Sequence, residues 1–485
     1  MKITNLTIHE TRDAINKGDL TYQEVTQAYV DRMENVEPEV GAYLTTTKEE
    51  ALEQAKNRSQ SGQGEKGDLF GIPYALKDNM CTKGIKTTCA SKILGNFVPP
   101  YNADVYDRLE SEGGVLLGKL NMDEFAMGSS TENSAYKITK NPWDTTKVPG
   151  GSSGGSAVAV AAEMAAYSLG SDTGGSIRQP AAFCGIVGLK PTYGLVSRFG
   201  LVAYASSLDQ IGPCTKDVED AALVLNAIAG HDSKDSTSIK QPKKDYLLGL
   251  KDGVKGLKIG VCKAFGGENL QPEISLAMDD TLKIYKDAGA EIVDLTFETL
   301  DFALSAYYII ASAEASSNLA RYDGVRYGVR AEEYKDLVDM YTKTRTQGFG
   351  DEVKRRIMLG TYALSSGYYD AYYKKAMQVR TLIMAEYKRV FGECDFLITP
   401  TTPSTAFGIG EKTGNPLDMY LADLFTVPIN IAGIPAISIP VGLDKAGLPI
   451  GLQLVGPALS EDVLLRGAYA LEQVVDFRKH SPKLG

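Results

Sequence analysis

The chain has 485 residues, a formal net charge of −10 at pH 7, and 43% hydrophobic and 23% charged residues, which is ordinary for a globular enzyme with a large core. The acidic balance argues against this chain being the main contact to a nucleic acid. No apolar run reaches the length of about 18 residues that a membrane-spanning helix needs, and the N-terminus lacks a signal-peptide core, so we expect a soluble, cytoplasmic protein without membrane contact.

Residues 1–60 are expected to form helices that pack on the rest of the chain and contact partners. Three S/T-x-x-E capping boxes begin these helices: Thr7 with Glu10, Thr21 with Glu24, and Thr47 with Glu50. From Gly71 onward, strand-like apolar runs alternate with helical segments, which predicts an α/β fold. The expected strands are 72–76, 115–117, 257–261, 291–295, 396–399, 436–440 and 451–455.

The stretch 113–119 imitates a phosphate-binding loop, because it matches G-x-x-x-x-G-K. The next residue is Leu120, so the hydroxyl that would bind Mg²⁺ is missing. The apolar middle of the stretch favours a strand.

Residues 302–390 are expected to be helical and are rich in Tyr and Arg. These two residue types can stack on RNA bases. They also suit the edges of an amphipathic core, and we favour that interpretation.

The six cysteines are scattered along the chain, without a C-x-x-C pair or a Cys/His cluster. This spacing predicts reduced packing residues. It suggests neither a disulfide framework nor a metal site.

Two Gly/Ser runs, 150–156 and 170–176, flank a small-residue segment that we expect to be one helix. Glycine lets backbone N–H groups turn inward, so such turns can present hydroxyls and amide donors to one small volume. This arrangement suits acyl transfer. A plain linker is the alternative, but a linker would not lead into the apolar segment 157–166, whose single charged residue is Glu163.

A serine nucleophile needs a base. The three histidines, His9, His231 and His480, lie far from both runs in the sequence and in polar or terminal settings. A Ser-His-Asp triad stays open but is disfavoured. Lys77 ends an apolar run, so burial could keep its amine neutral and make it the base.

Three motifs carry a resemblance: G-I-P-Y-A-L-K-D-N at 71–79, G-G-S-S-G-G-S at 150–156, and G-S-D-T-G-G-S-I-R-Q-P at 170–180. Together they resemble the amidase signature family. The resemblance implies a mixed central sheet flanked by helices on both faces, and a Ser-cisSer-Lys triad. By position, Ser176 matches the nucleophile, Ser152 the bridging serine after a cis peptide bond, and Lys77 the base.

The implied mechanism passes a proton from Ser176 to Ser152 and on to neutral Lys77, which requires the pKa of Lys77 to fall by roughly 3 units from its reference value of about 10.4. The oxyanion would rest on the backbone N–H groups of Thr173, Gly174, Gly175 and Ser176. Asp172 and Arg178 bracket this turn, and we interpret them as an internal ion pair.

Three stretches, 307–310, 313–324 and 355–360, resemble one branch of the family, the A subunits of glutamine-dependent tRNA amidotransferases. For a glutamine substrate, Arg356 suits the α-carboxylate, Asp423 the α-ammonium, and Tyr307 supplies a hydroxyl. Gly128 and Ser129, in a turn-rich loop, are further substrate-contact candidates.

This resemblance implies a glutaminase that supplies ammonia for converting Glu-tRNA(Gln) or Asp-tRNA(Asn) to the amidated product. A B subunit would use ATP and Mg²⁺ and would make most of the tRNA contact, and a C subunit would complete a heterotrimer. No cofactor is expected in this chain. We expect one amidase domain over 1–485, with N-terminal helices in 1–60, the catalytic core in 70–230 and a helical insertion in 297–395.

Two alternatives remain. A stand-alone amidase would hydrolyse small amides in isolation and would not need the Arg356/Asp423 pair. A non-catalytic scaffold would have lost Lys77, Ser152 or Ser176, yet all three are present.

Overall fold

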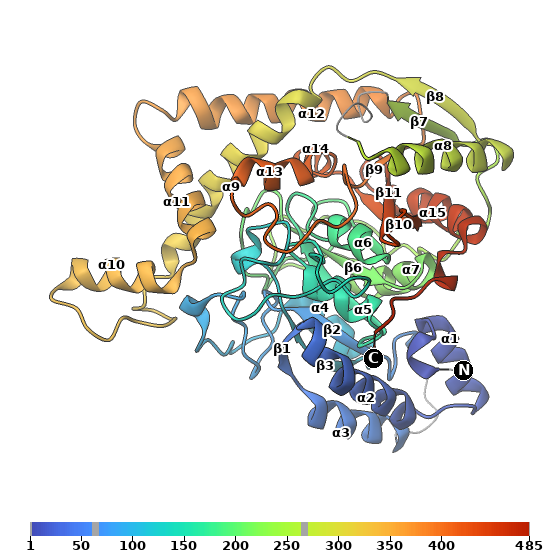
Figure 1. The fold of residues 1–485 in the computed structure, drawn as a ribbon, viewed down its shortest axis with the longest axis horizontal. Coiled ribbons are helices and arrows are strands. Elements are labelled where there is room, and N and C mark those ends of the chain that lie inside the picture. Colours follow the sequence, from blue (N-terminus) through green and yellow to red (C-terminus); the bar gives the residue numbers. More distant parts are fainter. Residues whose placement is uncertain (1, 61–66, 263–269, 485) are drawn as a thin grey trace.

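The computed structural model of the protein describes residues 2–60, 67–262 and 270–484. In these residues the strands form one mixed sheet of eleven strands, in the order β1-β3-β2-β4-β6-β5-β10-β11-β9-β7-β8. Helices surround this sheet (Figure 1), so the predicted α/β fold with a mixed central sheet is confirmed.

The strands have these bounds: β1 Tyr43–Thr46, β2 Pro73–Lys77, β3 Val115–Leu120, β4 Tyr167–Asp172, β5 Val187–Lys190, β6 Gln210–Thr215, β7 Lys258–Cys262, β8 Glu291–Leu295, β9 Phe396–Pro400, β10 Ala436–Leu443 and β11 Pro449–Val455. The α-helices are α1 Ile8–Lys17, α2 Tyr22–Val40, α3 Lys48–Gln60, α4 Asp104–Ser111, α5 Gly154–Ala161, α6 Arg178–Cys184, α7 Val218–Ile228, α8 Pro272–Asp287, α9 Ala303–Asn318, α10 Leu337–Gly348, α11 Asp351–Leu364, α12 Lys375–Val390, α13 Pro416–Tyr420, α14 Val427–Ala432 and α15 Glu461–Val475. All seven expected strands are present.

Two local predictions differ from the structure. The capping boxes at Thr7 and Thr21 form, but the Thr47 hydroxyl donates to the carbonyl of Leu116 at 2.7 Å, so the third box is wrong. The second difference concerns the segment between the Gly/Ser runs: it contains one helix, as predicted, but that helix does not reach the second run. Helix α5 ends at Ala161 and the strand β4 follows, so the second run begins inside a strand.

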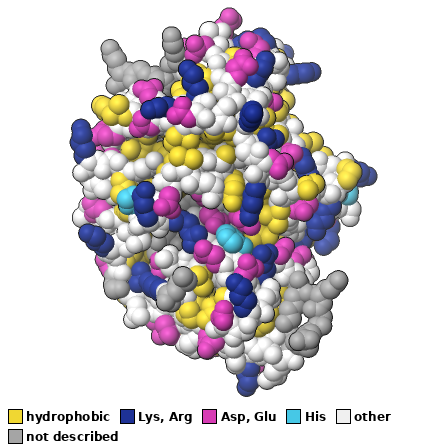
Figure 2. All heavy atoms as spheres, turned by 90° about the vertical axis from the view of Figure 1, so that its right-hand side faces the viewer, with side chains coloured by type: hydrophobic (Ala, Val, Ile, Leu, Met, Phe, Trp, Pro, Cys, Tyr) yellow, Lys and Arg dark blue, Asp and Glu magenta, His cyan; other side chains and the backbone are white. Residues whose placement is uncertain are grey.

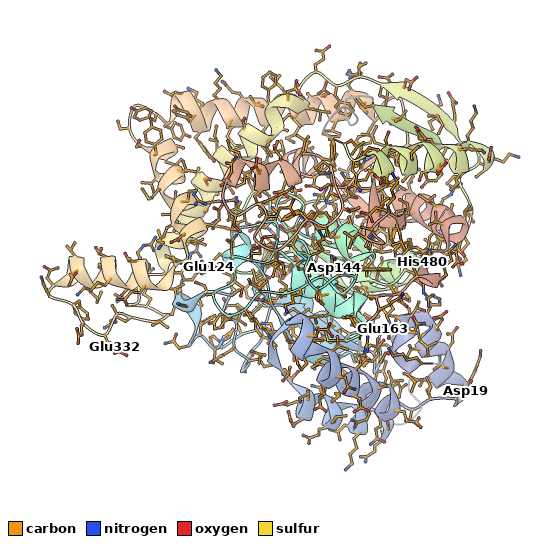
Figure 3. All side chains as sticks on the ribbon, viewed as in Figure 1. Asp19, Glu124, Asp144, Glu163, Glu332 and His480 are labelled. Carbon is orange, nitrogen blue, oxygen red and sulfur yellow. The ribbon has the colours of Figure 1, made fainter. Side chains whose placement is uncertain are left out.

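Helix α5 lies against the strands β2 and β4 because its residues are all Gly, Ser, Ala or Val. A Cβ on Gly155 would lie 2.4 Å from the Asn121 carbonyl oxygen, so only glycine permits this close approach. Glu163 follows the helix and pairs with Lys2 at 2.7 Å, beside the N-terminal segment (Figure 3).

The helices α9 to α12 all lie within the predicted insertion 297–395, and α10 and α11 extend away from the sheet (Figure 1). Helix α11 packs on α9, and α12 packs on α9 and α14. Among the described helices, none is both long and apolar enough to cross a membrane. One face of the molecule carries basic and acidic side chains interspersed (Figure 2).

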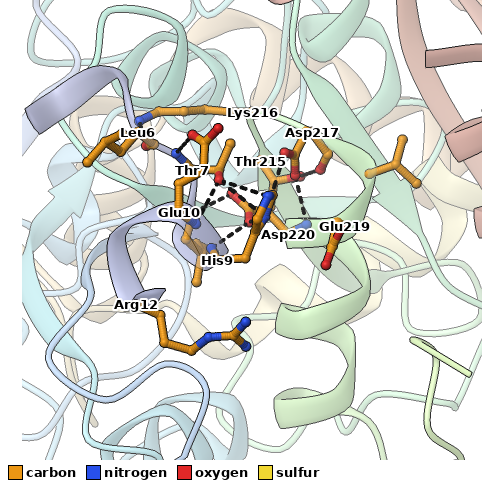
Figure 4. Close-up of polar contacts among 12 residues, drawn as sticks. Leu6, Thr7, His9, Glu10, Arg12, Thr215, Lys216, Asp217, Glu219 and Asp220 are labelled. Carbon is orange, nitrogen blue, oxygen red and sulfur yellow. Dashed lines mark hydrogen bonds and ion pairs between the residues drawn. The ribbon is translucent and has the colours of Figure 1, made fainter. Parts of the chain in front are cut away.

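The N-terminal segment is held against the junction of β6 and α7 (Figure 4). Lys216 Nζ donates to the carbonyls of Thr4 and Leu6, both at 2.6 Å. Asp220 accepts hydrogen bonds from the backbone and the ring of His9, at 3.3 and 3.0 Å. These contacts fix the start of the chain and helix α1 against the junction of β6 and α7.

This contact predicts a pH-dependent stability. Burial opposes charging of His9 and lowers its pKa. The Asp220 hydrogen bond and the charges of Asp220, Asp217 and Glu219 outweigh burial and raise the pKa of His9 to about 9. Arg478 also lies nearby, 3.7 Å from Asp217. Because the folded-state pKa exceeds the unfolded value, the stabilisation is complete below about pH 6.5 and is lost as the pH rises through about 9. We expect wild type to exceed His9→Gln by about 1–2 kcal/mol in free energy of unfolding near pH 6, after a discount for solvent screening.

Urea unfolding of both proteins between pH 6 and pH 9.5 measures this difference. The exposed His480 (Figure 3) provides the control, since His480→Gln should leave the pH dependence of wild type unchanged. A difference between wild type and His9→Gln that stays constant with pH would contradict the prediction.

Candidate active site

Lys77, the last residue of β2, lies fully buried between the two Gly/Ser runs. Its Nζ donates to the Ser152 and Ser153 hydroxyls at 2.7 and 2.8 Å and to the Ser171 carbonyl at 3.2 Å. Burial lowers the pKa of Lys77 to about 7, although nearby carboxylates, of which Asp123 is the strongest, oppose this shift. The amine can therefore be neutral near pH 7, as a general base must be.

Ser152 lies at a tightly packed turn. The Gly151–Ser152 peptide bond is cis, and the Ser152 carbonyl accepts from the backbone N–H of Asp123 at 3.2 Å. A Cβ on Gly151 would lie 2.1 Å from Asp123 Oδ2, so a larger residue cannot fit there. The next residue, Ser153, donates its N–H to the Ser176 carbonyl at 3.1 Å, which brings the two runs together.

Asp172, at the end of β4, organises the second run. Its carboxylate accepts from the backbone N–H groups of Gly175 and Ile177, at 2.8 and 3.2 Å, and from Arg178 Nε at 3.1 Å. Burial alone would raise the pKa of Asp172, but the Arg178 guanidinium lowers it to about 2. The predicted internal ion pair is confirmed.

Arg178 is fully buried and connects this turn to the C-terminal half of the chain. Its guanidinium donates to the Gln453 and Asn430 side chains at 2.9 and 2.5 Å and to the Thr426 carbonyl at 3.1 Å. The positive charge of Arg178 is therefore surrounded by four acceptor groups: these three and the Asp172 carboxylate.

The amide of Gly175 is occupied by Asp172, unlike the other three amides expected to bind an oxyanion. In the described part of the chain, the N–H groups of Thr173, Gly174 and Ser176 make no hydrogen bond. The Ser176 hydroxyl likewise has no hydrogen-bond partner there, and the residue is 8% exposed. The structure thus shows the contact of Lys77 with Ser152, but no hydrogen bond between Ser152 and Ser176.

Asp423 ends a short 3-10 helix (Leu421–Asp423), and the Thr426 hydroxyl links its carbonyl to that of Gly174 in the second Gly/Ser run. Its Oδ2 accepts from the Ser129 hydroxyl at 2.7 Å and from the Tyr308 hydroxyl at 3.4 Å. Burial raises the pKa of Asp423 to about 7, against the opposing effects of Ser129 and Arg356.

Arg356, on α11, is only 3% exposed. Its Nε donates to Glu352 at 2.7 Å and its Nη1 to the Tyr204 hydroxyl at 2.5 Å. Its Cζ lies 4.9 and 5.2 Å from the ring centres of Tyr308 and Tyr420, within cation–π range.

The comparisons with known proteins agree with this geometry. A family model described as Amidase matches residues 24–465. The A subunit of glutamyl-tRNA(Gln) amidotransferase from Caldanaerobacter subterraneus subsp. tengcongensis is 60% identical over 486 residues, covering 100% of this chain and 99% of that protein.

The chain belongs to the amidase family. Among solved structures, the A subunit of glutamyl-tRNA(Gln) amidotransferase from Thermotoga maritima aligns with a TM-score of 0.84 at 41% identity, covering 100% of this chain and 99% of that one. The peptide amidase from Stenotrophomonas maltophilia aligns with a TM-score of 0.83 at 30% identity, covering 99% and 98%. The fold of this amidase is therefore shared by enzymes whose names give different substrates.

Two of the predicted substrate residues of this amidase, Tyr307 and Gly128, pack against other parts of the site and not against Asp423. A Cβ on Gly174 would lie 2.6 Å from Tyr307 Cζ, so Tyr307 packs on the second Gly/Ser run. Gly128 has a φ of +157° and faces Asp123, since a Cβ there would lie 2.4 Å from Asp123 Cγ. Ser129 is the member of this loop that reaches Asp423.

Sequence reasoning missed several polar side chains of the site. Ser153 is adjacent to a predicted residue and could have been found from the run itself. Tyr308 is next to the predicted Tyr307 in the stretch 307–310, which also could have suggested it. The others, Tyr204, Glu352 and Tyr420, come from separate segments and carried no motif.

A possible metal cluster lies outside this site. His9, Asp217 and Asp220 bring ligand atoms within 4.8 Å of one another. Asp220 already accepts from the backbone of Ile8 and from His9, and Arg478 lies 3.7 Å from Asp217. Hydrogen bonds and ion pairs satisfy this cluster without an ion.

Proposed function

We propose that this amidase is the glutaminase component of a tRNA-dependent amidotransferase. The proposal rests on one observation: the buried site combines Lys77, which is hydrogen-bonded to Ser152, with Arg356 and Asp423, which do not pair with each other. Free glutamine presents an amide, an α-carboxylate and an α-ammonium, which match Lys77/Ser152/Ser176, Arg356 and Asp423. The names of the relatives at 60% and 59% identity support the same choice.

In the proposed mechanism, neutral Lys77 accepts the proton of Ser152 while Ser152 accepts that of Ser176. The Ser176 oxygen attacks the carboxamide carbon, and the free amides of Thr173, Gly174 and Ser176 stabilise the oxyanion. The same relay returns a proton to the leaving nitrogen, and ammonia departs. Water then attacks the acyl-enzyme, releases glutamate and restores Ser176.

The ammonia would serve the conversion of Glu-tRNA(Gln), or of Asp-tRNA(Asn), on a partner. We infer a cytoplasmic heterotrimer in which a B subunit uses ATP and Mg²⁺ and makes most of the tRNA contact, and a C subunit joins the two. The net charge of −10 supports this division, because tRNA binding would fall to the partner.

The test measures ammonia release from glutamine by the full chain alone and with its B and C partners. We expect weak turnover alone, an increase with the partners and charged tRNA, and a loss of about 10⁴-fold or more in Ser176→Ala. Ser316→Ala is the matched control, because the Ser316 hydroxyl donates to the Ala313 carbonyl of its own helix, α9. Rapid turnover of simple amides by the chain alone, with glutamine and the partners ignored, would favour a stand-alone amidase.

A further inference from the structure

Glu352 lies one helical turn before Arg356 on α11, and its side chain is 10% exposed. Its Oε1 accepts from Arg356 Nε at 2.7 Å and from the Tyr420 hydroxyl at 3.0 Å. Its Oε2 accepts from Arg355. Both oxygens of this carboxylate are therefore occupied, and Glu352 is held in one place.

The contacts of Arg356 leave one part of its guanidinium open. Nε is bound by Glu352 and Nη1 by the Tyr204 hydroxyl. Across the described part of the chain, Nη2 makes no hydrogen bond. The rings of Tyr308 and Tyr420, at 4.9 and 5.2 Å from Cζ, restrict how far the group can turn.

The acidic group of the site, Asp423, accepts hydrogen bonds from residues other than those that hydrogen-bond to Arg356. Asp423 is bound by Ser129 and Tyr308, and the described residues show no ion pair between Asp423 and Arg356. In a buried site, two opposite charges attract strongly, so an arginine without another carboxylate would move toward the aspartate. That movement would close the space in which a zwitterion binds.

We propose that Glu352 is a positioning residue that holds Arg356 away from Asp423, and that it thereby sets the preference of the site for amides carrying an α-carboxylate. This inference rests on the proposed glutaminase function and adds to it the residue that keeps the arginine available. Tyr420 supports Glu352 through its hydroxyl, so it acts on the same contact. Both residues act through Arg356 and do not take part in the chemistry.

The test compares glutamine with 4-aminobutanamide, which keeps the amide and the ammonium but lacks the α-carboxylate. For Glu352→Gln in the full chain, with partner subunits where turnover needs them, we expect KM for glutamine to rise about 10-fold or more. We expect kcat to change by less than about 3-fold, and kcat/KM for 4-aminobutanamide to stay within about 3-fold of wild type. Asp351→Asn is the matched control, because Asp351 is exposed and pairs with Lys354.

Equal losses on both substrates, or no change on either, would overturn the inference, because a merely structural role cannot separate them. If Glu352→Gln does not fold, the variant Tyr420→Phe tests the same inference. It keeps the ring beside Arg356, and we expect a smaller rise in KM for glutamine alone; unchanged selectivity would overturn the inference. Wild type and Ser176→Ala are measured together, so a failure of glutaminase activity itself is distinguished from a failure of Glu352 alone.

Discussion

Replacing Lys77 by methionine is expected to lower kcat for glutamine hydrolysis by about 10³-fold or more. Methionine fills most of the buried space but cannot accept the proton of Ser152. In the wild type, Lys77 Nζ lies 2.7 Å from Ser152 Oγ. Lys190→Met is the matched control, because Lys190 is equally buried, has a pKa lowered to about 7 by burial, and donates to the Pro191 carbonyl instead of to a serine. Steady-state ammonia release from both variants provides the comparison.

The wild type is also expected to lose activity in acid. Burial lowers the pKa of Lys77 to about 7, so the amine is neutral above that pH and charged below it. The base is lost when Lys77 is charged, so kcat should rise as the pH increases through about 7 and then level off. Measuring kcat at saturating glutamine separates this effect from Asp423, whose pKa of about 7 affects binding. A flat profile between pH 6 and pH 8.5, or full activity in Lys77→Met, would contradict the assignment of Lys77 as the base.

Arg178→Met is expected to lower the free energy of unfolding by about 3–5 kcal/mol, because it leaves the Asp172 carboxylate buried without its cation. The variant also removes the donors to Asn430, Gln453 and the Thr426 carbonyl. Urea unfolding followed by fluorescence measures the change.

The control for this variant is Arg389→Met, since the Arg389 side chain is 50% exposed. Its ion pair with Glu393, whose side chain is also 50% exposed, lies on the surface, where such pairs contribute about 0–1 kcal/mol. Equal urea midpoints for the two variants would show that the Arg178 network does not stabilise the fold.

The sequence predicted those features of the site that depend on neighbours along the chain. Lys77 ends an apolar run, and the structure shows that this run is a buried strand with the lysine as its last, fully buried residue. Asp172 and Arg178 are six residues apart around one turn, and they pair as expected. In both cases, local pattern alone decides where the side chain lies.

Features that depend on distant packing were not predictable. Tyr307 and Tyr308 are adjacent on a helix, so they face different directions, and only the packing of α9 decides that Tyr308 reaches Asp423. The spacing of Glu352 and Arg356 is also common on exposed helix surfaces. Their burial comes from Tyr204 and Tyr420, which lie more than sixty residues away in the sequence on either side.

The order of strands in the sheet has a consequence for how the chain is made. The strands up to Thr215 form one side, β1-β3-β2-β4-β6-β5, and those from Lys258 onward form the other, with β5 and β10 meeting between them. A growing polypeptide can therefore assemble the six strands around Lys77, Ser152 and Ser176 before its second half leaves the ribosome. Arg178 still lacks its acceptors on Asn430 and Gln453 at that stage. In the proposed mechanism, a truncated product would contain Lys77, Ser152 and Ser176 without the support that holds the turn before Ser176, so completing translation would also complete the enzyme.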